Sequence, residues 1–273
     1  MAAPVSNADK IVRCTVMIES MAGGTILGTG SGLLMIMKLP PPHADLATGV
    51  VVTNKHVVEG ADSVRFTLSG TTSGQKITST SPFSAVLYHP EDEVDLCLIP
   101  VPDEAMKDGF HKHTFISSDD IFRADRLKQL TAIESVLMIG YPNGIIDQDD
   151  LYPIARRGIT ATPAYQNFDG EPQFLIDCAC FPGSSGSPVF LFDPQGFVDR
   201  ENNVQLGAMR FGLVGFLYAG PVLNQEGHVV AKAPPAKLSQ MVEVPLMLNL
   251  GFCVGAEKLD GFIPAIKDIA GVS

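Results

Sequence analysis

The chain has 273 residues, 45% of them hydrophobic and 18% charged, and its formal net charge is −11. This length suffices for one sizeable folded unit but is too short for that unit plus an appended binding module. The acidic charge argues against nucleic-acid partners and against anionic membranes, whose phosphates would repel it.

The first residues show no targeting or membrane segment. Residues 1–10 lack the basic and apolar regions of a secretory signal and are expected to form a loose tail. The longest early apolar run, residues 33–37, is too short to span a bilayer. We therefore expect a cytoplasmic protein.

The five cysteines are an odd number and lie in strand-like apolar contexts, which is atypical of a disulfide framework. We expect reduced core thiols. Cys178 and Cys180 are the candidates for a metal site, but the single residue between them places their side chains on opposite faces of a strand, so no metal is expected.

The first half of the chain is predicted to form short strands separated by turns. Residues 11–18 and 30–38 alternate and are rich in β-branched residues, and the proline-rich residues 39–43 break the pattern. Further strands are expected at residues 49–53, 63–69, 75–78, 84–89 and 96–101. Helical periodicity is scarce, so the pattern indicates an all-β protein with strands at barrel-like spacing.

A polar connection over residues 116–130 is expected between two sets of strands, and Asp119 and Asp120 in it are predicted to cap a short helix. The second set of strands is expected at residues 135–140, 156–160, 174–180, 211–220 and 249–254. An acidic loop, residues 147–150, lies among them.

Two segments near the end of the chain depart from the strand pattern. Residues 221–248 form an insertion that acts either as a lid or exosite or as a plain surface elaboration. Residues 257–273 carry apolar side chains at helical spacing, which predicts a C-terminal helix.

The stretch 181–190 reads Phe-Pro-Gly-Ser-Ser-Gly-Ser-Pro-Val-Phe and holds a serine on a bend. Gly183 and Gly186 allow unusual backbone dihedrals on either side of the serine pair. A hydroxyl acts as a nucleophile when it projects from a rigid turn whose N–H groups point at the developing oxyanion. An ordinary Gly/Ser turn is the alternative for this stretch alone.

Two upstream residues are candidate partners for that serine. His56 follows a β-rich run, and Asp95 precedes the apolar residues 96–99. Singly, each is typical of a packed or solvated side chain. Together with the serine, they give the order His, Asp, Ser that the chymotrypsin fold uses.

With these motifs, the chain resembles the trypsin-like serine peptidases, and within them the bacterial type that includes the HtrA proteases. The matching segments are residues 28–34 (Gly-Thr-Gly-Ser-Gly-Leu-Leu), 53–58, 94–96, 139–142, 177–188 and 250–254. The resemblance implies two six-stranded antiparallel β-barrels and a closing helix. The first barrel is expected over residues 11–115 and the second over residues 131–256, without a PDZ domain.

The resemblance also implies a serine endopeptidase that needs no cofactor. Ser185 would be the nucleophile, His56 the general base and then acid, and Asp95 the residue that orients the imidazole. The backbone N–H groups of Gly183 and Ser185 would form the oxyanion hole. The expected partner is a protein or peptide substrate.

Ser184 and Ser187 are rival nucleophiles, but only Ser185 has the family's Gly-x-Ser-Gly frame. Ser184 also stands where digestive members carry an acid that pairs with a new N-terminus. We therefore expect the chain to fold directly into an active form, or to be controlled by loop order or by a regulatory protein partner.

By the same resemblance, the pocket for the residue before the scissile bond is lined by Ala179, Cys180, Tyr218, Ala219 and Gly220. None of these side chains is charged, which disfavours cleavage after Lys or Arg and favours small or medium apolar residues. The acidic loop, residues 147–150, either favours basic residues elsewhere in the peptide or is simply solvated.

Two other functions remain open at this point. One is a catalytically silent module that keeps the barrels and holds a peptide in the groove, although the presence of all three triad residue types argues against it. The other is an esterase that uses the same serine.

Overall fold

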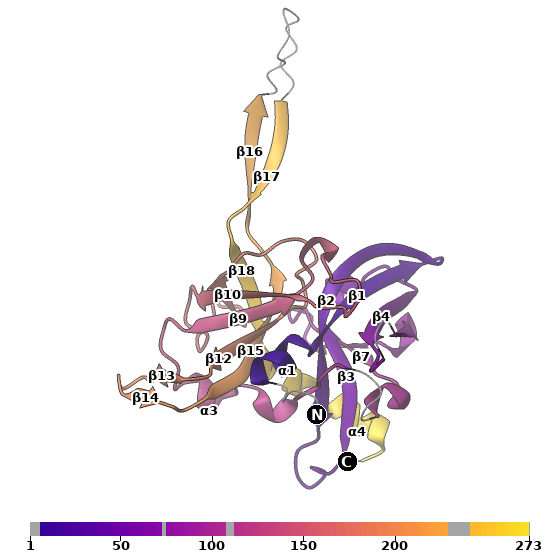
Figure 1. Cartoon of the computed structure of the whole chain (residues 1–273), viewed down its shortest axis with the longest axis horizontal. Helices are drawn as coiled ribbons and strands as arrows, with labels where there is room; N and C mark the ends of the chain where they lie inside the picture. Colours follow the sequence, from indigo (N-terminus) through magenta and orange to yellow (C-terminus); the bar gives the residue numbers. More distant parts are fainter. Residues whose placement is uncertain (1–5, 73–74, 108–111, 229–240, 273) are drawn as a thin grey trace, which may run out of the picture.

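The computed structural model describes residues 6–72, 75–107, 112–228 and 241–272. Figure 1 shows two β-rich units side by side, with a two-stranded hairpin projecting beyond them. The expected all-β, chymotrypsin-like architecture with a closing helix is confirmed.

The first unit is an eight-stranded sheet with the order β5-β4-β1-β2-β3-β7-β6, and β8 runs parallel beside β2. The described strands leave β5 and β6 as edges, so this unit is an open half-barrel rather than the closed six-stranded barrel we expected. Its strands are β1 (Thr15–Ala22), β2 (Thr25–Lys38), β3 (Ala47–Thr53), β4 (Ser63–Ser69), β5 (Lys76–Pro82), β6 (Leu87–Tyr88), β7 (Cys97–Pro100) and β8 (Ile116–Ser117).

Strand β2 is the centre of this unit because it pairs with β1, β3 and β8. Its side chains alternate between two cores, as the pleat of a strand requires. Leu33, Met35 and Met37 enter one apolar cluster, whereas Leu34 enters another together with Val51 and Phe66. Both faces of β2 are therefore covered, which makes it a rigid support for residues 30 and 31.

The second unit is a closed six-stranded barrel in the order β10-β11-β18-β15-β12-β9. Its strands are β9 (Ser135–Gly140), β10 (Ile154–Thr160), β11 (Gln173–Asp177), β12 (Pro188–Asp193), β15 (Arg210–Ala219) and β18 (Leu250–Gly255). A short hairpin of β13 (Gly196–Val198) and β14 (Val204–Leu206) extends from it.

The helical segments are α1 (Asn7–Val12), α2 (Lys55–Val58), α3 (Ala124–Leu127), α4 (Ile263–Ala270) and the 3-10 turns η1 (Phe83–Ala85), η2 (Asp103–Met106), η3 (Ser118–Asp120), η4 (Pro142–Gly144) and η5 (Ala256–Phe262). Asp119 and Asp120 thus lie in a 3-10 turn ahead of α3 rather than capping a helix. Among the described helices, none has the length and apolar character needed to cross a bilayer.

Residues 7–10 belong to helix α1 and not to the loose tail we expected. Ser6 and Asp9 form a reciprocal capping box at its start, which satisfies N–H groups that a helix end leaves unpaired. Ile11, only 3% exposed, anchors the helix in the main apolar cluster. Capping and burial together explain why this segment is ordered.

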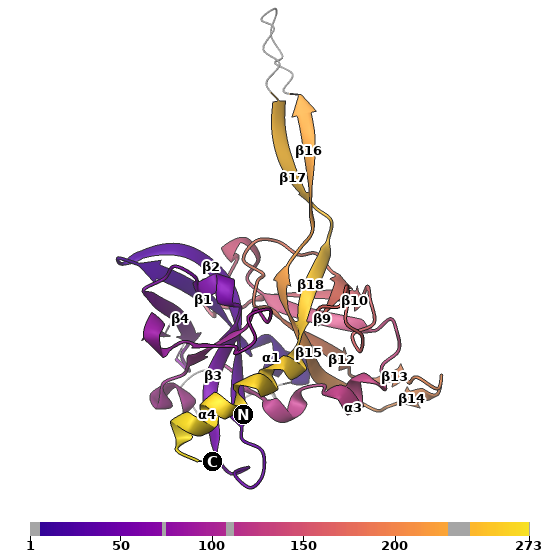
Figure 2. The same cartoon turned by 180° about the vertical axis from the view of Figure 1, so that it is seen from behind.

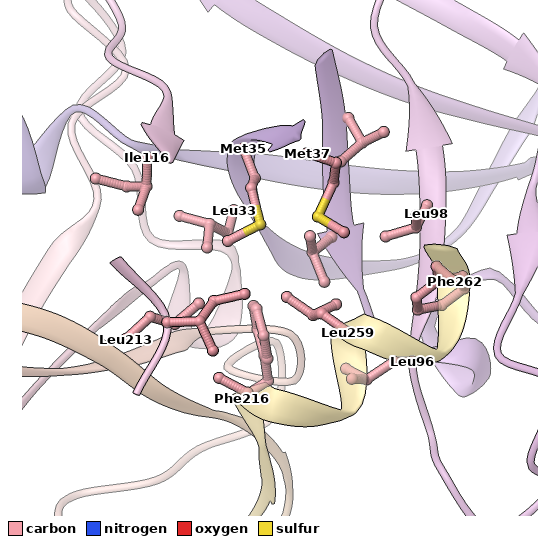
Figure 3. Close-up of a cluster of buried hydrophobic side chains, with 14 of the residues drawn as sticks. Leu33, Met35, Met37, Leu96, Leu98, Ile116, Leu213, Phe216, Leu259 and Phe262 are labelled. Atoms are coloured by element: carbon pink, nitrogen blue, oxygen red, sulfur yellow. The ribbon is translucent and has the colours of Figure 1, made fainter. Parts of the chain in front are cut away.

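The main apolar cluster joins the two units and the closing helical segment. In Figure 3, side chains from β2, such as Leu33, point toward Phe216 of β15 and toward Leu259 and Phe262 of η5. Figure 2, the view from behind, shows the segment that contains α4 running from the end of β18 across the near side of the first unit. The two units therefore share one core, which holds their facing surfaces in a defined relation.

The insertion over residues 221–248 contains a hairpin of β16 (Val222–His228) and β17 (Met241–Met247), with residues 229–240 outside the described part of the chain. The two strands pair in register from Val222 opposite Met247 to His228 opposite Met241. In both views the hairpin stands clear of the two units (Figures 1 and 2). The hairpin therefore does not fold back over either unit.

Candidate active site

His56 is delivered by the junction between β3 and the short helix α2. Asn54, the residue before this helix, is fully buried, and its side-chain amide donates to the backbone carbonyl of Asp95 over 2.7 Å. This bond ties the start of α2 to the segment that carries Asp95. The two candidate residues are thus held together through the backbone as well as through their side chains.

The Asp95 carboxylate contacts His56 at two points. Nδ1 of His56 lies 2.5 Å from Oδ2 of Asp95, and the backbone N–H of His56 donates to Oδ1 over 3.2 Å. The paired ring nitrogen fixes the orientation of the imidazole and leaves Nε2 for a reacting group. The His56 side chain is 43% exposed, so a substrate has access to it.

Ser185 lies in a turn that only glycines permit. Gly183 and Gly186 have φ angles of +82° and +83°. A Cβ added to Gly186 would lie 2.0 Å from the carbonyl oxygen of Ser31 and 2.5 Å from Oγ1 of Thr53. The turn is therefore pressed against β2 and β3 of the first unit, and the two glycines of the motif are both required by the backbone.

The helix of His56 and the turn of Ser185 meet on either side of Gly30. A Cβ on Gly30 would lie 2.5 Å from Cγ1 of Val57, the neighbour of His56, and 3.3 Å from the carbonyl oxygen of Ser185. The structure thus brings the predicted histidine and serine segments to one point of β2, even though they come from different units.

The hydroxyl of Ser185 does not bond to His56 in this structure. It donates to the backbone carbonyl of Tyr218 over 3.4 Å, a long and weak bond. Serine has a single side-chain torsion, so its hydroxyl reorients without movement of the backbone, and catalytic hydrogen bonds often form fully only when substrate binds.

Two peptide groups beside Ser185 are oriented so that their N–H groups are free. The carbonyl of Pro182 accepts a bond from the N–H of Asn143 over 2.6 Å, and the carbonyl of Ser184 accepts one from the N–H of Ser187 over 3.0 Å. In a trans peptide the N–H points opposite to the C=O. The N–H groups of Gly183 and Ser185, which belong to these two peptides, therefore point away from Asn143 and Ser187.

Neither of these two N–H groups donates to an acceptor in the described part of the chain. Two unpaired N–H groups on one short turn can accept the oxyanion of an acyl-transfer intermediate. The oxyanion hole at Gly183 and Ser185 stays a prediction of the resemblance.

Asn143 is a contributor that the sequence analysis did not single out. It lies in turn η4 with a φ of +51°, and Gly144 follows with a φ of +67°. The dipeptide Asn-Gly is typical of turns with positive φ, so this signal was present in the sequence. Its contact with Pro182 depends on the fold and had no local signal.

The rival nucleophiles are enclosed. Ser184 and Ser187 are 1% and 0% exposed, and within the described structure neither hydroxyl has a hydrogen-bond partner. Ser185 is partly exposed. Of the three serines, Ser185 is thus the one that a substrate can reach.

The predicted pocket residues lie around the nucleophile turn. Cys180 is buried and Ala179 half-buried, while Ala219 is exposed at the end of β15. The hydroxyl of Tyr218 donates to Oε1 of Gln173. Burial raises the pKa of Tyr218, and the nearby charge of Asp95 adds to this shift.

Arg156 of β10 was not anticipated at this place. Its guanidinium donates to the carbonyl of Ala179 and lies 4.7 Å from the centroid of the Phe181 ring. Within the described residues it makes no ion pair, so its charge is not neutralised by a neighbouring carboxylate. The sequence offers no local signal for this contact because Arg156 lies on a different strand.

Part of the acidic loop, residues 147–150, is engaged within the protein. Asp150 lies 2.5 Å from Nζ of Lys112, and its N–H donates to the carboxylate of Asp147 over 3.0 Å. The bond with Lys112 lowers the pKa of Asp150. The loop therefore offers less free negative charge to a substrate than its composition indicates.

A hollow of about 470 Å³ adjoins the candidate triad; its lining residues are Lys55, His56, Glu59, Phe83, Tyr88, Asp92 and Asp95. Burial raises the pKa of Tyr88 to about 12, and the nearby carboxylate of Glu59 adds to this shift. Peptide side chains that lie next to the imidazole have room here.

The five cysteines all lie in the described part of the chain, where they are buried and unpaired. Burial raises the pKa of each thiol, including Cys178 and Cys180. Within the described residues, no group of three or more His, Cys, Asp or Glu side chains is placed to hold a metal ion.

Comparison with known proteins identifies the family to which the chain belongs. The model of the trypsin-like peptidase domain matches residues 44–198, more than half of the chain. No curated protein matches the chain. A serine endoprotease from Yersinia pestis superposes with a TM-score of 0.51 at 15% identity, covering 97% of this chain and 68% of that one.

The inactive form of a mutant of Rv3671c from M. tuberculosis superposes with a TM-score of 0.46 at 16% identity, covering 98% of this chain and 97% of that one. At these identities the Yersinia structure supports the fold, and the family assignment depends on the domain match. The matched region contains His56, Asp95 and Ser185, the residues whose geometry is described above. The chain belongs to the trypsin-like peptidase family.

Proposed function

We propose that this peptidase cleaves peptide bonds through an acyl-enzyme on Ser185, with His56 as the base and Asp95 as the orienting acid. The observation that carries this proposal is the pair of free N–H groups, those of Gly183 and Ser185, on the turn of an accessible serine. A structural Gly/Ser turn has no need to keep two donors unpaired. The His56–Asp95 pair supplies the base such a turn requires.

In the proposed reaction, the Ser185 hydroxyl turns from the Tyr218 carbonyl toward Nε2 of His56 and attacks the substrate carbonyl carbon. His56 takes the hydroxyl proton, and the carbonyl oxygen becomes an oxyanion bonded by the two N–H groups. Collapse of the intermediate breaks the C–N bond, and His56 gives its proton to the leaving amine. Water, activated by His56, then releases the acyl group.

Labelling with a fluorophosphonate probe tests the proposed nucleophile. Wild-type protein should form a covalent adduct with the probe, and Ser185→Ala should not, because the adduct forms on the activated hydroxyl. Ser184→Ala is the matched control, since the Ser184 hydroxyl is buried, and it should still be labelled. The readout is the mass of the intact protein.

Absence of labelling in the wild type, or equal labelling of the wild type and Ser185→Ala, would contradict the proposal. The first result favours the silent peptide-binding module and the second a different nucleophile. An esterase would be labelled as well, so hydrolysis of a peptide amide substrate separates it from a peptidase.

We propose further that the residue before the scissile bond is small or medium and apolar. Ala179 and Cys180, the proposed lining, carry no charge, and burying an unpaired Lys or Arg side chain there costs several kcal/mol. The guanidinium of Arg156 at the Ala179 carbonyl adds repulsion against a basic residue. Both effects disfavour cleavage after Lys or Arg.

Profiling of a peptide library tests this specificity. Cleavage after Ala, Val, Leu or Met should exceed cleavage after Lys or Arg by at least about 100-fold in kcat/KM. Arg156→Met keeps much of the length of the side chain but removes its charge. This variant should therefore lower the ratio of kcat/KM for apolar residues to kcat/KM for Lys or Arg. Dominant cleavage after Lys or Arg in the wild type would show that Ala179 is not at the base of the pocket.

A further inference from the structure

Ser31 contacts the nucleophile turn at two points from the opposite unit. It lies in β2, is fully buried, and its hydroxyl donates to the carbonyl of Gly183 over 3.0 Å. Its backbone N–H donates to the carbonyl of Ser185 over 2.8 Å. Ser31 therefore holds the carbonyl groups of the same two residues whose N–H groups are free.

The hydroxyl of Ser31 is also an acceptor. The N–H of Tyr141 donates to it over 2.9 Å, and Tyr141 begins the turn whose Asn143 holds the Pro182 carbonyl. A single hydroxyl thus connects β2, the Tyr141 turn and the nucleophile turn. Ser31 and Tyr141 are both buried, so a buried N–H would be left without an acceptor if the hydroxyl were removed.

Together these bonds account for every carbonyl from Pro182 to Ser185. The second unit itself holds the carbonyls of Pro182 and Ser184, and Ser31 holds those of Gly183 and Ser185. Each of these four carbonyls accepts one bond, and the N–H groups of Ser184 and Gly186 donate as well, to the carbonyls of Phe181 and Leu217. Two of the four bonds come from one residue of the other unit.

We propose that Ser31 is a positioning residue for the oxyanion hole. Its hydroxyl holds the Gly183–Ser184 peptide, which lies between the two peptides that carry the free N–H groups, and it anchors the Tyr141 turn that holds one of those two peptides. This inference rests on the proposed peptidase function. Within the described structure, the buried hydroxyl of Ser184 has no hydrogen-bond partner, so it does not share this role with Ser31.

Removal of the hydroxyl should loosen the turn locally. The Gly183 carbonyl would lose its donor, and the buried N–H of Tyr141 its acceptor. Glycine at φ +82° imposes little resistance to rotation of the adjoining peptides. Without the Ser31 hydroxyl, the turn that begins at Tyr141 would hold the Pro182 carbonyl less firmly through Asn143, and the Gly183 N–H would be less firmly aimed at the oxyanion.

Kinetics of Ser31→Ala test the proposal. We expect kcat for a peptide substrate to fall about 10- to 100-fold, because oxyanion donors act in the transition state and small misplacements reduce catalysis strongly. KM should stay within about threefold of the wild-type value, since ground-state binding is retained.

Ser20→Ala is the matched control. Ser20 lies on the neighbouring strand β1, is 3% exposed, and its hydroxyl donates to the carbonyl of Gly28 over 3.2 Å. It is thus a buried hydroxyl on a backbone carbonyl, as Ser31 is, but away from the nucleophile turn. We expect its kcat to match the wild type even if both variants lose similar thermal stability.

Inhibition by a peptide aldehyde gives a second readout that a purely structural role would not change. An aldehyde adds to the serine and forms an oxyanion, so its affinity should fall for Ser31→Ala in parallel with kcat. The affinity of the corresponding peptide acid product, which forms no oxyanion by addition, should change far less.

Three outcomes decide the proposal. Ser185-dependent turnover in the wild type with an unchanged kcat in Ser31→Ala overturns the role of Ser31 alone. Wild-type protein without Ser185-dependent turnover overturns the peptidase function and this inference with it. If Ser31→Ala does not fold, Ser31→Cys, a weaker donor, must show a lower kcat at similar KM, and a wild-type kcat in that variant overturns the proposal.

Discussion

His56→Ala and Ser185→Ala are each expected to lower kcat for peptide hydrolysis by about 10,000-fold or more, and the double variant should be little worse than either. The reason is that His56 contributes as a base only by taking the proton of the Ser185 hydroxyl. That hydroxyl, in turn, is a strong nucleophile only when His56 takes its proton. The measurement is steady-state hydrolysis of one amide substrate by the three variants.

The rate of hydrolysis that remains in these variants tests the role of the oxyanion hole. The free N–H groups of Gly183 and Ser185 remain in all three variants, so a small rate above the uncatalysed reaction should persist. Losses that multiply in the double variant would show that His56 and Ser185 do not act as a unit. Melting temperatures measured on the same samples separate loss of catalysis from loss of fold.

Asp95→Asn should also lower kcat by about 10,000-fold. The carboxylate accepts both from the His56 ring over 2.5 Å and from the His56 backbone N–H over 3.2 Å. An amide donates where the carboxylate accepts, and so favours the wrong tautomer of the imidazole. Steady-state kinetics with the same substrate measure the effect.

Asp92→Asn is the matched control for this substitution. Asp92 lies in the same loop, its side chain is exposed, and its backbone carbonyl lies 3.5 Å from Nζ of Lys55, which the substitution leaves in place. A mild effect is expected. If Asp92→Asn proved more damaging than Asp95→Asn, the orienting acid would have to be reassigned to Asp92.

Several features of the protein follow from local sequence. The strands of the first unit alternate, and the pleat of β2 sends Leu33 and Leu34 into different cores, as period-two alternation predicts. Gly183 and Gly186 have the positive φ angles that a nucleophile turn requires, and glycine alone adopts them freely. The all-β, chymotrypsin-like class therefore lay within reach of the sequence.

Helix capping and the closure of a sheet at its edge strands are features that local sequence patterns specify poorly. The capping box of Ser6 and Asp9 starts α1 in a segment expected to be a tail. The first unit stays open at β5 and β6, because strand number does not decide whether a sheet closes. The β16–β17 hairpin stands away from both units, and this position likewise depends on the tertiary structure and not on the local sequence.

By itself the sequence determined which residues are available for chemistry: a histidine, an aspartate and a glycine-flanked serine in a recognisable order. Only the tertiary structure decided how the turn is held. Ser31 and Gly183 are 152 positions apart, and Arg156 meets Ala179 from another strand. Such contacts leave no periodicity in the chain, because a hydrogen bond between distant segments depends on the packing of both units and not on local backbone preference.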